Sequence, residues 1–286
     1  MESRENISPS AAYTHQTVPT KIINVNGTDF TYRSFGKADG IPVVFLQHFT
    51  GNMDNWDPEL TNAIADKHPV IIFNNKGVGS SKGTTPDNVD AMAQDAVDFI
   101  RALGYDKINL LGFSLGGFIA QQIAADYPEL VNKLILAGTG PIGGKAIAQL
   151  ESHLQEAFVD GPERVLINLF FSKTPTSSKA GEVFLERLAE RKLDRDSPSS
   201  QETITSQARA IIGYGSVKDE SYRQLKSIGQ PVLIVNGNDD IMVDSVNSYI
   251  MLQNIPNAKL VMWSDSGHGG LFQYNKDFAA EVNAFL

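Results

Sequence analysis

Six short runs of apolar residues, rich in valine, isoleucine and leucine, recur along the chain, and helical patterns lie between them. They lie at 42–47, 69–74, 107–113, 133–138, 231–236 and 258–263. The runs are apolar almost throughout, which is typical of strands that are buried on both faces of a sheet. Their alternation with helices predicts an α/β fold with a mostly parallel central sheet that is flanked by helices. Asn26-Gly27, between two alternating runs in Lys21 to Tyr32, predicts a β-hairpin before this sheet.

The alternation is interrupted between the fourth and the fifth run. The stretch from Pro141 to Gln230 contains no convincing strand. Because structureless loops of this length are rare in compact domains, the stretch is predicted to be a helical insertion. We therefore divide the chain into a flexible N-terminal arm (1–20), an α/β core (21–141 and 229–286) and a helical cap (142–228). Helical patterns in the cap lie at 145–158, 162–171, 179–192, 201–212 and 219–227.

The composition disfavours several classes of function. Acidic residues outnumber basic ones by 33 to 24, and the net charge of −9 argues against nucleic-acid binding, which needs clustered Lys and Arg. The chain has no cysteine, which removes thiolate metal sites and a cysteine nucleophile. Its apolar runs are too short to span a bilayer, and residues 1–20 lack the apolar segment of a signal peptide. We therefore expect a cytoplasmic protein, monomeric or homodimeric, with no membrane contact.

The pattern Gly-x-Ser-x-Gly occurs twice, around Ser114 and around Ser81. Ser114 directly follows a predicted buried strand and directly precedes a predicted helix, whereas Ser81 lies in a glycine-rich loop. Glycines at 112, 116 and 117 allow a sharp turn that would lift the Ser114 hydroxyl above the sheet, at a helix N-terminus that favours negative charge. Ser114 is therefore the predicted nucleophile, and Ser81 is predicted to be a structural loop residue.

A serine nucleophile needs a base, and the base needs an acid that orients it. With the nucleophile at a strand–helix junction, both follow it in the chain. Of the two histidines after Ser114, His153 lies in the predicted cap and His268 lies in a small-residue loop after the last strand, so His268 is the predicted base. Asp240, just after the strand at 231–236, is the predicted acid, and the adjacent Asp239 is its main rival.

Two backbone N–H groups should also stabilise the negative oxygen that forms during attack on a carbonyl. One is predicted at Leu115, directly after the nucleophile, and the other at Phe49, in the loop after the strand at 42–47. His48 in that loop and Trp56 just beyond it are candidates for the substrate pocket. For both side chains a structural role is the more common alternative.

Three motifs, GFSLGG at 112–117, NGNDDIMV at 236–243 and SGHGG at 266–270, resemble those of the α/β-hydrolase superfamily. The resemblance extends over about residues 21–286, and it is strongest to the helical-capped branch with esterases, lactonases and perhydrolases. It implies a serine hydrolase that cleaves a small-molecule ester or lactone through an acyl-enzyme, without metal or cofactor. The chain departs from the family at His48, where relatives commonly have glycine.

The resemblance leaves other reactions open. The same three residues support cofactor-free perhydrolase or haloperoxidase chemistry, and they also support hydrolysis of a C–C bond. A non-catalytic ligand-binding protein on the same fold is a further alternative, which an intact set of Ser114, Asp240 and His268 argues against.

Overall fold

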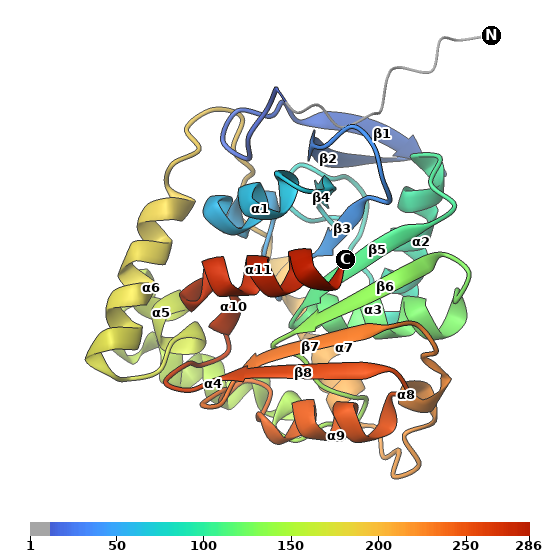
Figure 1. Cartoon of the computed structure of the whole chain (residues 1–286). Helices are drawn as coiled ribbons and strands as arrows, with labels where there is room; N and C mark the ends of the chain where they lie inside the picture. Colours follow the sequence, from blue (N-terminus) through green and yellow to red (C-terminus); the bar gives the residue numbers. More distant parts are fainter. Residues whose placement is uncertain (1–11) are drawn as a thin grey trace, which may run out of the picture.

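An eight-stranded sheet forms the centre of the protein in a computed structural model, which describes residues 12–286 (Figure 1). The strand order is β1-β2-β4-β3-β5-β6-β7-β8, with β1 and β2 antiparallel to their neighbours and all other pairs parallel. The predicted hairpin and the predicted mostly parallel sheet are both confirmed. The strands are β1 (Lys21–Val25), β2 (Thr28–Gly36), β3 (Val43–Leu46), β4 (Pro69–Phe73), β5 (Ile108–Phe113), β6 (Val131–Ala137), β7 (Val232–Gly237) and β8 (Ala258–Trp263).

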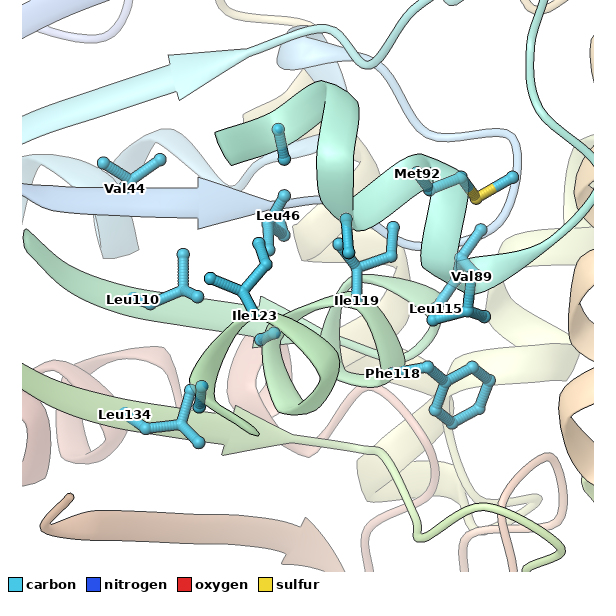
Figure 2. Close-up of a cluster of buried hydrophobic side chains, with 14 of the residues drawn as sticks. Val44, Leu46, Val89, Met92, Leu110, Leu115, Phe118, Ile119, Ile123 and Leu134 are labelled. Carbon is cyan, nitrogen blue, oxygen red and sulfur yellow. The ribbon is translucent and has the colours of Figure 1, made fainter. Parts of the chain in front are cut away.

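Side chains of the central strands alternate between two hydrophobic cores, one on each face of the sheet. Val44 and Leu46 of β3 face the core that α2 (Val89–Ala102) and α3 (Leu115–Asp126) cover, as Figure 2 shows. Val43 and Phe45 of the same strand face the other core, which is built with α1 (Pro58–Ala65), α10 (Gly270–Gln273) and α11 (Asn275–Phe285). Burial on both faces explains why these strands are apolar throughout.

The last strand, β8, differs from the other five strands that the apolar runs form because it lies at an edge of the sheet. None of its six residues is fully buried, although the run is as apolar in sequence as those of the inner strands. Next to it lies α9 (Val246–Asn254) (Figure 1). The apolar character of this run therefore predicted the strand correctly but overestimated how deeply it is buried.

Between β6 and β7 the described chain forms helices and no strand; some of these helices lie by the carboxyl ends of β7 and β8, and the last one, at 223–227, lies by their amino ends (Figure 1). We call residues 142–228 the cap segment. The helix predicted at 201–212 continues further, to Ser216. The helix predicted at 179–192 begins earlier, at Pro175, because the Thr174 side chain caps its start by accepting a hydrogen bond from the Ser177 N–H. Its α-helices are α4 (Leu150–Ala157), α5 (Val165–Phe170), α6 (Pro175–Leu188), α7 (Gln201–Ser216) and α8 (Arg223–Ser227).

Buried ion pairs join the cap segment to the core, and the shortest of them is between Arg187 and Asp57. Arg187 of α6 donates to both carboxylate oxygens of Asp57 over 2.7–3.0 Å, and Asp57 also caps α1 by accepting from the Glu59 N–H. The Asp57 side chain is fully buried. Loss of Arg187 would leave a buried carboxylate without its partner, which is strongly unfavourable, so this pair fixes where the cap segment lies on the core.

The start of the chain differs from the flexible arm that the sequence predicted. Residues 1–11 of that arm lie outside the described residues. Within 12–20, His15 and Val18 are buried, the His15 N–H donates to Asn62 Oδ1 over 2.8 Å, and Arg191 of the cap segment donates to the His15 carbonyl over 2.9 Å. Two isolated buried residues in a polar stretch produce no periodic pattern, so this packing leaves no sequence signal.

Candidate active site

Ser114 lies in a sharp turn between β5 and α3. Its backbone angles are φ 55° and ψ −119°, a region that residues other than glycine rarely adopt. The surrounding chain holds this conformation, because the Ser114 N–H donates to the Ala137 carbonyl over 3.0 Å and the Thr139 hydroxyl donates to the Ser114 carbonyl over 3.0 Å. The Ser114 side chain makes no capping hydrogen bond to the helix that it precedes. Its hydroxyl is therefore available to a ligand.

Three glycines make this turn possible. A Cβ atom at Gly112 would overlap the Gly116 carbonyl, one at Gly116 would overlap the Leu46 carbonyl, and one at Gly117 would overlap the Thr139 side chain. The start of α3 therefore packs directly against the backbone at the end of β3. This close approach brings the loop after β3 next to Ser114.

Asp240 and His268 meet across the carboxyl ends of β7 and β8. Asp240 Oδ2 accepts a hydrogen bond from His268 Nδ1 over 2.8 Å, and both side chains are almost fully buried. The other oxygen, Oδ1, accepts from the N–H groups of Met242 and Val243 over 2.9 and 3.0 Å. Because Nδ1 carries the proton that Asp240 accepts, neutral His268 has an unprotonated Nε2.

The rival acid, Asp239, is turned away from this pair. Its side chain is exposed, and its carboxylate accepts a hydrogen bond from Ser172 of the cap segment over 3.2 Å. The structure thus brings Asp240, and not Asp239, into contact with His268.

Ser114 and His268 line the same cavity, which has a volume of about 540 Å³. Within residues 12–286 no hydrogen bond joins the Ser114 hydroxyl to His268, and such contacts are often long without substrate. Asp54, Arg195 and Asp196 lie at a polar end of the cavity. Its apolar wall comes largely from the cap segment, from Leu154, Phe158, Val165, Leu166, Leu169, Phe170 and Ile204.

The loop after β3 and the start of α3 each contain a backbone N–H without an acceptor in the described part of the chain. Phe49 lines the cavity beside Ser114, and Leu115 is the first residue of α3. The N–H groups of Phe49 and Leu115 have no hydrogen-bond acceptor in the described part of the chain. Two unpaired donors near a serine hydroxyl are what stabilisation of an oxyanion requires.

The cap segment holds this loop in shape, which the sequence did not predict. Thr50, directly after Phe49, has a positive φ of 62°. Its N–H donates to the side-chain oxygen of Gln207 on α7 over 2.6 Å, and its carbonyl accepts from the Ser199 hydroxyl over 2.9 Å. Gln207 is buried. The conformation of the loop beside Ser114 therefore depends on two residues of the cap segment.

His48 lines the cavity and is tied to the same loop. Its Nδ1 donates to the Phe49 carbonyl over 2.8 Å, and its ring packs edge-on against Phe113 and Phe170. Burial lowers the pKa of His48 to about 4, so the ring is neutral at pH 7. A neutral ring adds no positive charge beside His268, which must itself accept a proton to act as a base.

Trp56 does not belong to the cavity, which corrects the sequence-based interpretation. It is fully buried and packs against Phe45, Phe113 and Phe272, beneath the site. Its position a few residues after the loop suggested a pocket residue, but the turn at η1 (Met53–Asn55) directs it into the core.

The two other sequence candidates also lie outside the site. Ser81 donates to the Asn74 carbonyl and accepts from the Thr31 N–H, both over 2.9 Å, so its hydroxyl is engaged in the fold. His153 lies on α4 and does not line the cavity.

Two further properties concern the described residues as a whole. Across 12–286, no cluster of three or more His, Asp or Glu side chains has the arrangement of a metal site. No helix in the same range combines the length and the apolar character that crossing a membrane demands.

Comparisons with known proteins agree with the architecture. A family model for the alpha/beta hydrolase fold matches residues 41–273. The solved structure of an alpha/beta hydrolase fold protein from Chitinophaga pinensis is 42% identical with a TM-score of 0.92, and the match covers 96% of this chain and 98% of that one.

Two curated relatives carry different activity names. The dihydrolipoyllysine-residue acetyltransferase component of the acetoin cleaving system from Cupriavidus necator is 27% identical over 92% of this chain and 68% of its own length. A poly(3-hydroxyalkanoate) depolymerase from Ectopseudomonas oleovorans is 28% identical over 88% of this chain and 86% of its own length.

Proposed function

Because the chain belongs to the α/β-hydrolase fold family, we propose that it is a serine hydrolase that cleaves a small-molecule ester or lactone. The observation that carries the proposal is the 2.8 Å hydrogen bond between Asp240 and His268, in a cavity that Ser114 also lines. A buried acid–histidine pair that shares a cavity with a serine on a strained turn fits nucleophilic acyl transfer. The differing names of the relatives do not choose the substrate, so the proposal depends on the site itself.

In the first step the Ser114 oxygen attacks the carbonyl carbon, and His268 Nε2 takes the hydroxyl proton. Asp240 keeps the imidazole in the tautomer that can do this and stabilises the imidazolium that forms. The N–H groups of Phe49 and Leu115 stabilise the negative oxygen of the tetrahedral intermediate. When the intermediate collapses, the carbon–oxygen bond to the alcohol breaks, and His268 gives its proton to the departing oxygen.

In the second step water attacks the acyl-enzyme. His268 accepts one proton of this water, the ester bond to Ser114 breaks, and the proton returns to the Ser114 oxygen. The products are the acid and the free enzyme, so the reaction needs no other reactant.

Labelling with a fluorophosphonate, followed by intact-mass measurement, tests the proposal. We expect one adduct per chain on the wild type and on Ser81→Ala, and none on Ser114→Ala, because Ser114 lines the same cavity as His268 whereas the Ser81 hydroxyl is bonded inside the fold. A wild-type protein that forms no adduct would be a ligand-binding protein on this fold and would refute the proposal.

Gln207 is proposed as a positioning residue for the oxyanion site. Gln207→Met keeps the volume of the side chain but removes the acceptor for the Thr50 N–H, so the loop that carries Phe49 should relax from its strained shape. We expect kcat to fall about tenfold with little change in KM, less than the loss of a whole oxyanion donor. Steady-state kinetics on one ester would measure this.

The matched control for Gln207 is Thr205→Ala on the same helix. Thr205 is exposed and bonds only within α7, to the Gln201 carbonyl, so its loss should leave kcat and KM unchanged. Equal kcat values for Gln207→Met and the wild type would show that the loop keeps its shape without the hydrogen bond to Gln207.

A further inference from the structure

Ser114 lies between two cavities of very different size. The large one, of about 540 Å³, contains His268 and the apolar wall of the cap segment. The small one, of about 20 Å³, lies beside Ser114 and does not include His268. Phe49, Ser114 and Met242 line both. The small cavity is otherwise entirely apolar, lined by Phe118, Ile147, Leu150, Ile211 and Val243.

We propose that the small cavity holds the acyl tail of the substrate and the large cavity holds its alcohol, so that this protein prefers short-acyl esters of bulky alcohols. The proposal rests on the serine hydrolase function proposed above, and it names the class of substrate for that site.

The chemistry of acyl transfer assigns the two cavities. Four groups surround the carbon of the tetrahedral intermediate: the Ser114 oxygen, the oxyanion, the alcohol oxygen and the acyl tail. His268 must reach both the Ser114 oxygen and the alcohol oxygen, because it takes a proton from the first and gives it to the second. The alcohol therefore lies on the side of His268, in the large cavity. The acyl tail points away from His268, toward the small cavity.

The size of the small cavity limits the acyl tail. A void of about 10–15 Å³ is the smallest that holds one water molecule, which is close to a methyl group in size. A cavity of about 20 Å³ therefore has room for a tail of about one or two carbons. Its walls cannot yield easily, because Phe118, Leu150 and Ile211 are buried and the Phe118 ring stacks on Tyr214 at 4.4 Å.

The large cavity suits the alcohol because it is much larger and its lining contains both apolar and polar residues. Its volume lies in the range of about 300–1,000 Å³ that small-molecule sites usually have. Its lining includes the apolar side chains of Phe170 and Leu166 and the polar residues Asn52 and Arg195. An alcohol with an aromatic or aliphatic body fits such a surface.

Two series of esters test the assignment. The first varies the acyl chain of p-nitrophenyl esters from acetyl to octanoyl, and the second varies the alcohol of acetate esters from ethyl to naphthyl. We expect kcat/KM to be highest for acetyl or propionyl and to fall by about tenfold or more by hexanoyl, as one unaccommodated methylene can cost this much. Naphthyl acetate should be cleaved at least as efficiently as ethyl acetate.

Variants of single lining residues test which cavity holds the acyl tail and which holds the alcohol. Ile211→Ala, on α7, enlarges only the small cavity and should move the acyl optimum toward butanoyl or longer. Leu150→Ala, on α4, provides the same test if Ile211→Ala does not fold. Leu166→Ala enlarges only the large cavity and should leave the acyl optimum unchanged while it alters the order of the acetates. A wild-type optimum at octanoyl, or an acyl optimum that moves with Leu166→Ala and not with Ile211→Ala, would overturn the assignment. Either result would leave the serine hydrolase proposal standing, whereas no ester cleavage together with no fluorophosphonate adduct would refute that proposal itself.

Discussion

Replacing Ser114 by alanine should lower kcat for any ester substrate by about 10⁴- to 10⁶-fold, because the proposed attacking oxygen is lost. KM should change little. The free energy of unfolding should stay within about 0.5 kcal/mol of the wild type, because the Ser114 side chain makes no capping hydrogen bond and its backbone contacts remain. Steady-state kinetics and urea unfolding on the same preparations measure both quantities.

Ser81→Ala is the matched control, because Ser81 occupies the second copy of the same sequence pattern. Its hydroxyl bonds to the Asn74 carbonyl and the Thr31 N–H inside the fold, so the variant should lose about 1–3 kcal/mol of stability. The folded enzyme should keep the wild-type kcat. If Ser81→Ala were inactive while folded and Ser114→Ala were active, the nucleophile would be assigned to the wrong serine.

The two serines illustrate what the sequence could reveal about the site. Ser114 was distinguishable because its context is local: a buried strand, a helix and three glycines all lie within a few residues of it. The same is true of the six apolar runs, each of which forms a strand: burial on both faces leaves a continuous apolar signal in the inner strands, and the edge strand β8 carries a similar apolar run. Features that a few adjacent residues determine were therefore predictable.

Features that depend on contacts between residues far apart in the sequence could not be predicted. Gln207 contacts Thr50 across 157 positions of sequence, and nothing about a glutamine on a helix indicates that its side chain will accept from one particular N–H. The contacts of His15 with Asn62 and Arg191 likewise join residues that lie 47 and 176 positions apart. Trp56 was misassigned for a related reason. It lies close to His48 in sequence, but this closeness did not reveal that the Trp56 side chain, after the turn at η1, packs in the core against Phe45.

The position of the acid, Asp239 or Asp240, was predictable only in part from adjacent residues. Both residues lie in the loop that follows β7, so the sequence located the acid to within one position. Adjacent side chains on such a loop point in different directions, however, and only the fold determines which one faces His268. In the structure Asp240 is buried against the histidine, whereas Asp239 is exposed and contacts Ser172.

Because Asp240 and not Asp239 contacts His268, we expect replacement of Asp240 to cause the second large loss of kcat. Asp240→Asn should lower kcat by about 10⁴-fold, because the amide that replaces the carboxylate can donate to His268 Nδ1 and so favours the tautomer with the proton on Nε2. A protonated Nε2 cannot accept the Ser114 proton. Asparagine keeps an oxygen for the Met242 and Val243 N–H groups, so the loop itself should hold its shape.

Asp239→Asn is the control from the same loop, and it should change kcat by less than about threefold, because exposed polar contacts of this kind contribute little. Kinetics with one ester and thermal unfolding of both variants would separate loss of catalysis from loss of structure. If Asp239→Asn reduced kcat by orders of magnitude while Asp240→Asn did not, the hydrogen bond at 2.8 Å would not be the one that orients the base. Because the two residues are adjacent and undergo the same chemical change, a large ratio between their effects can arise only from which of them faces His268.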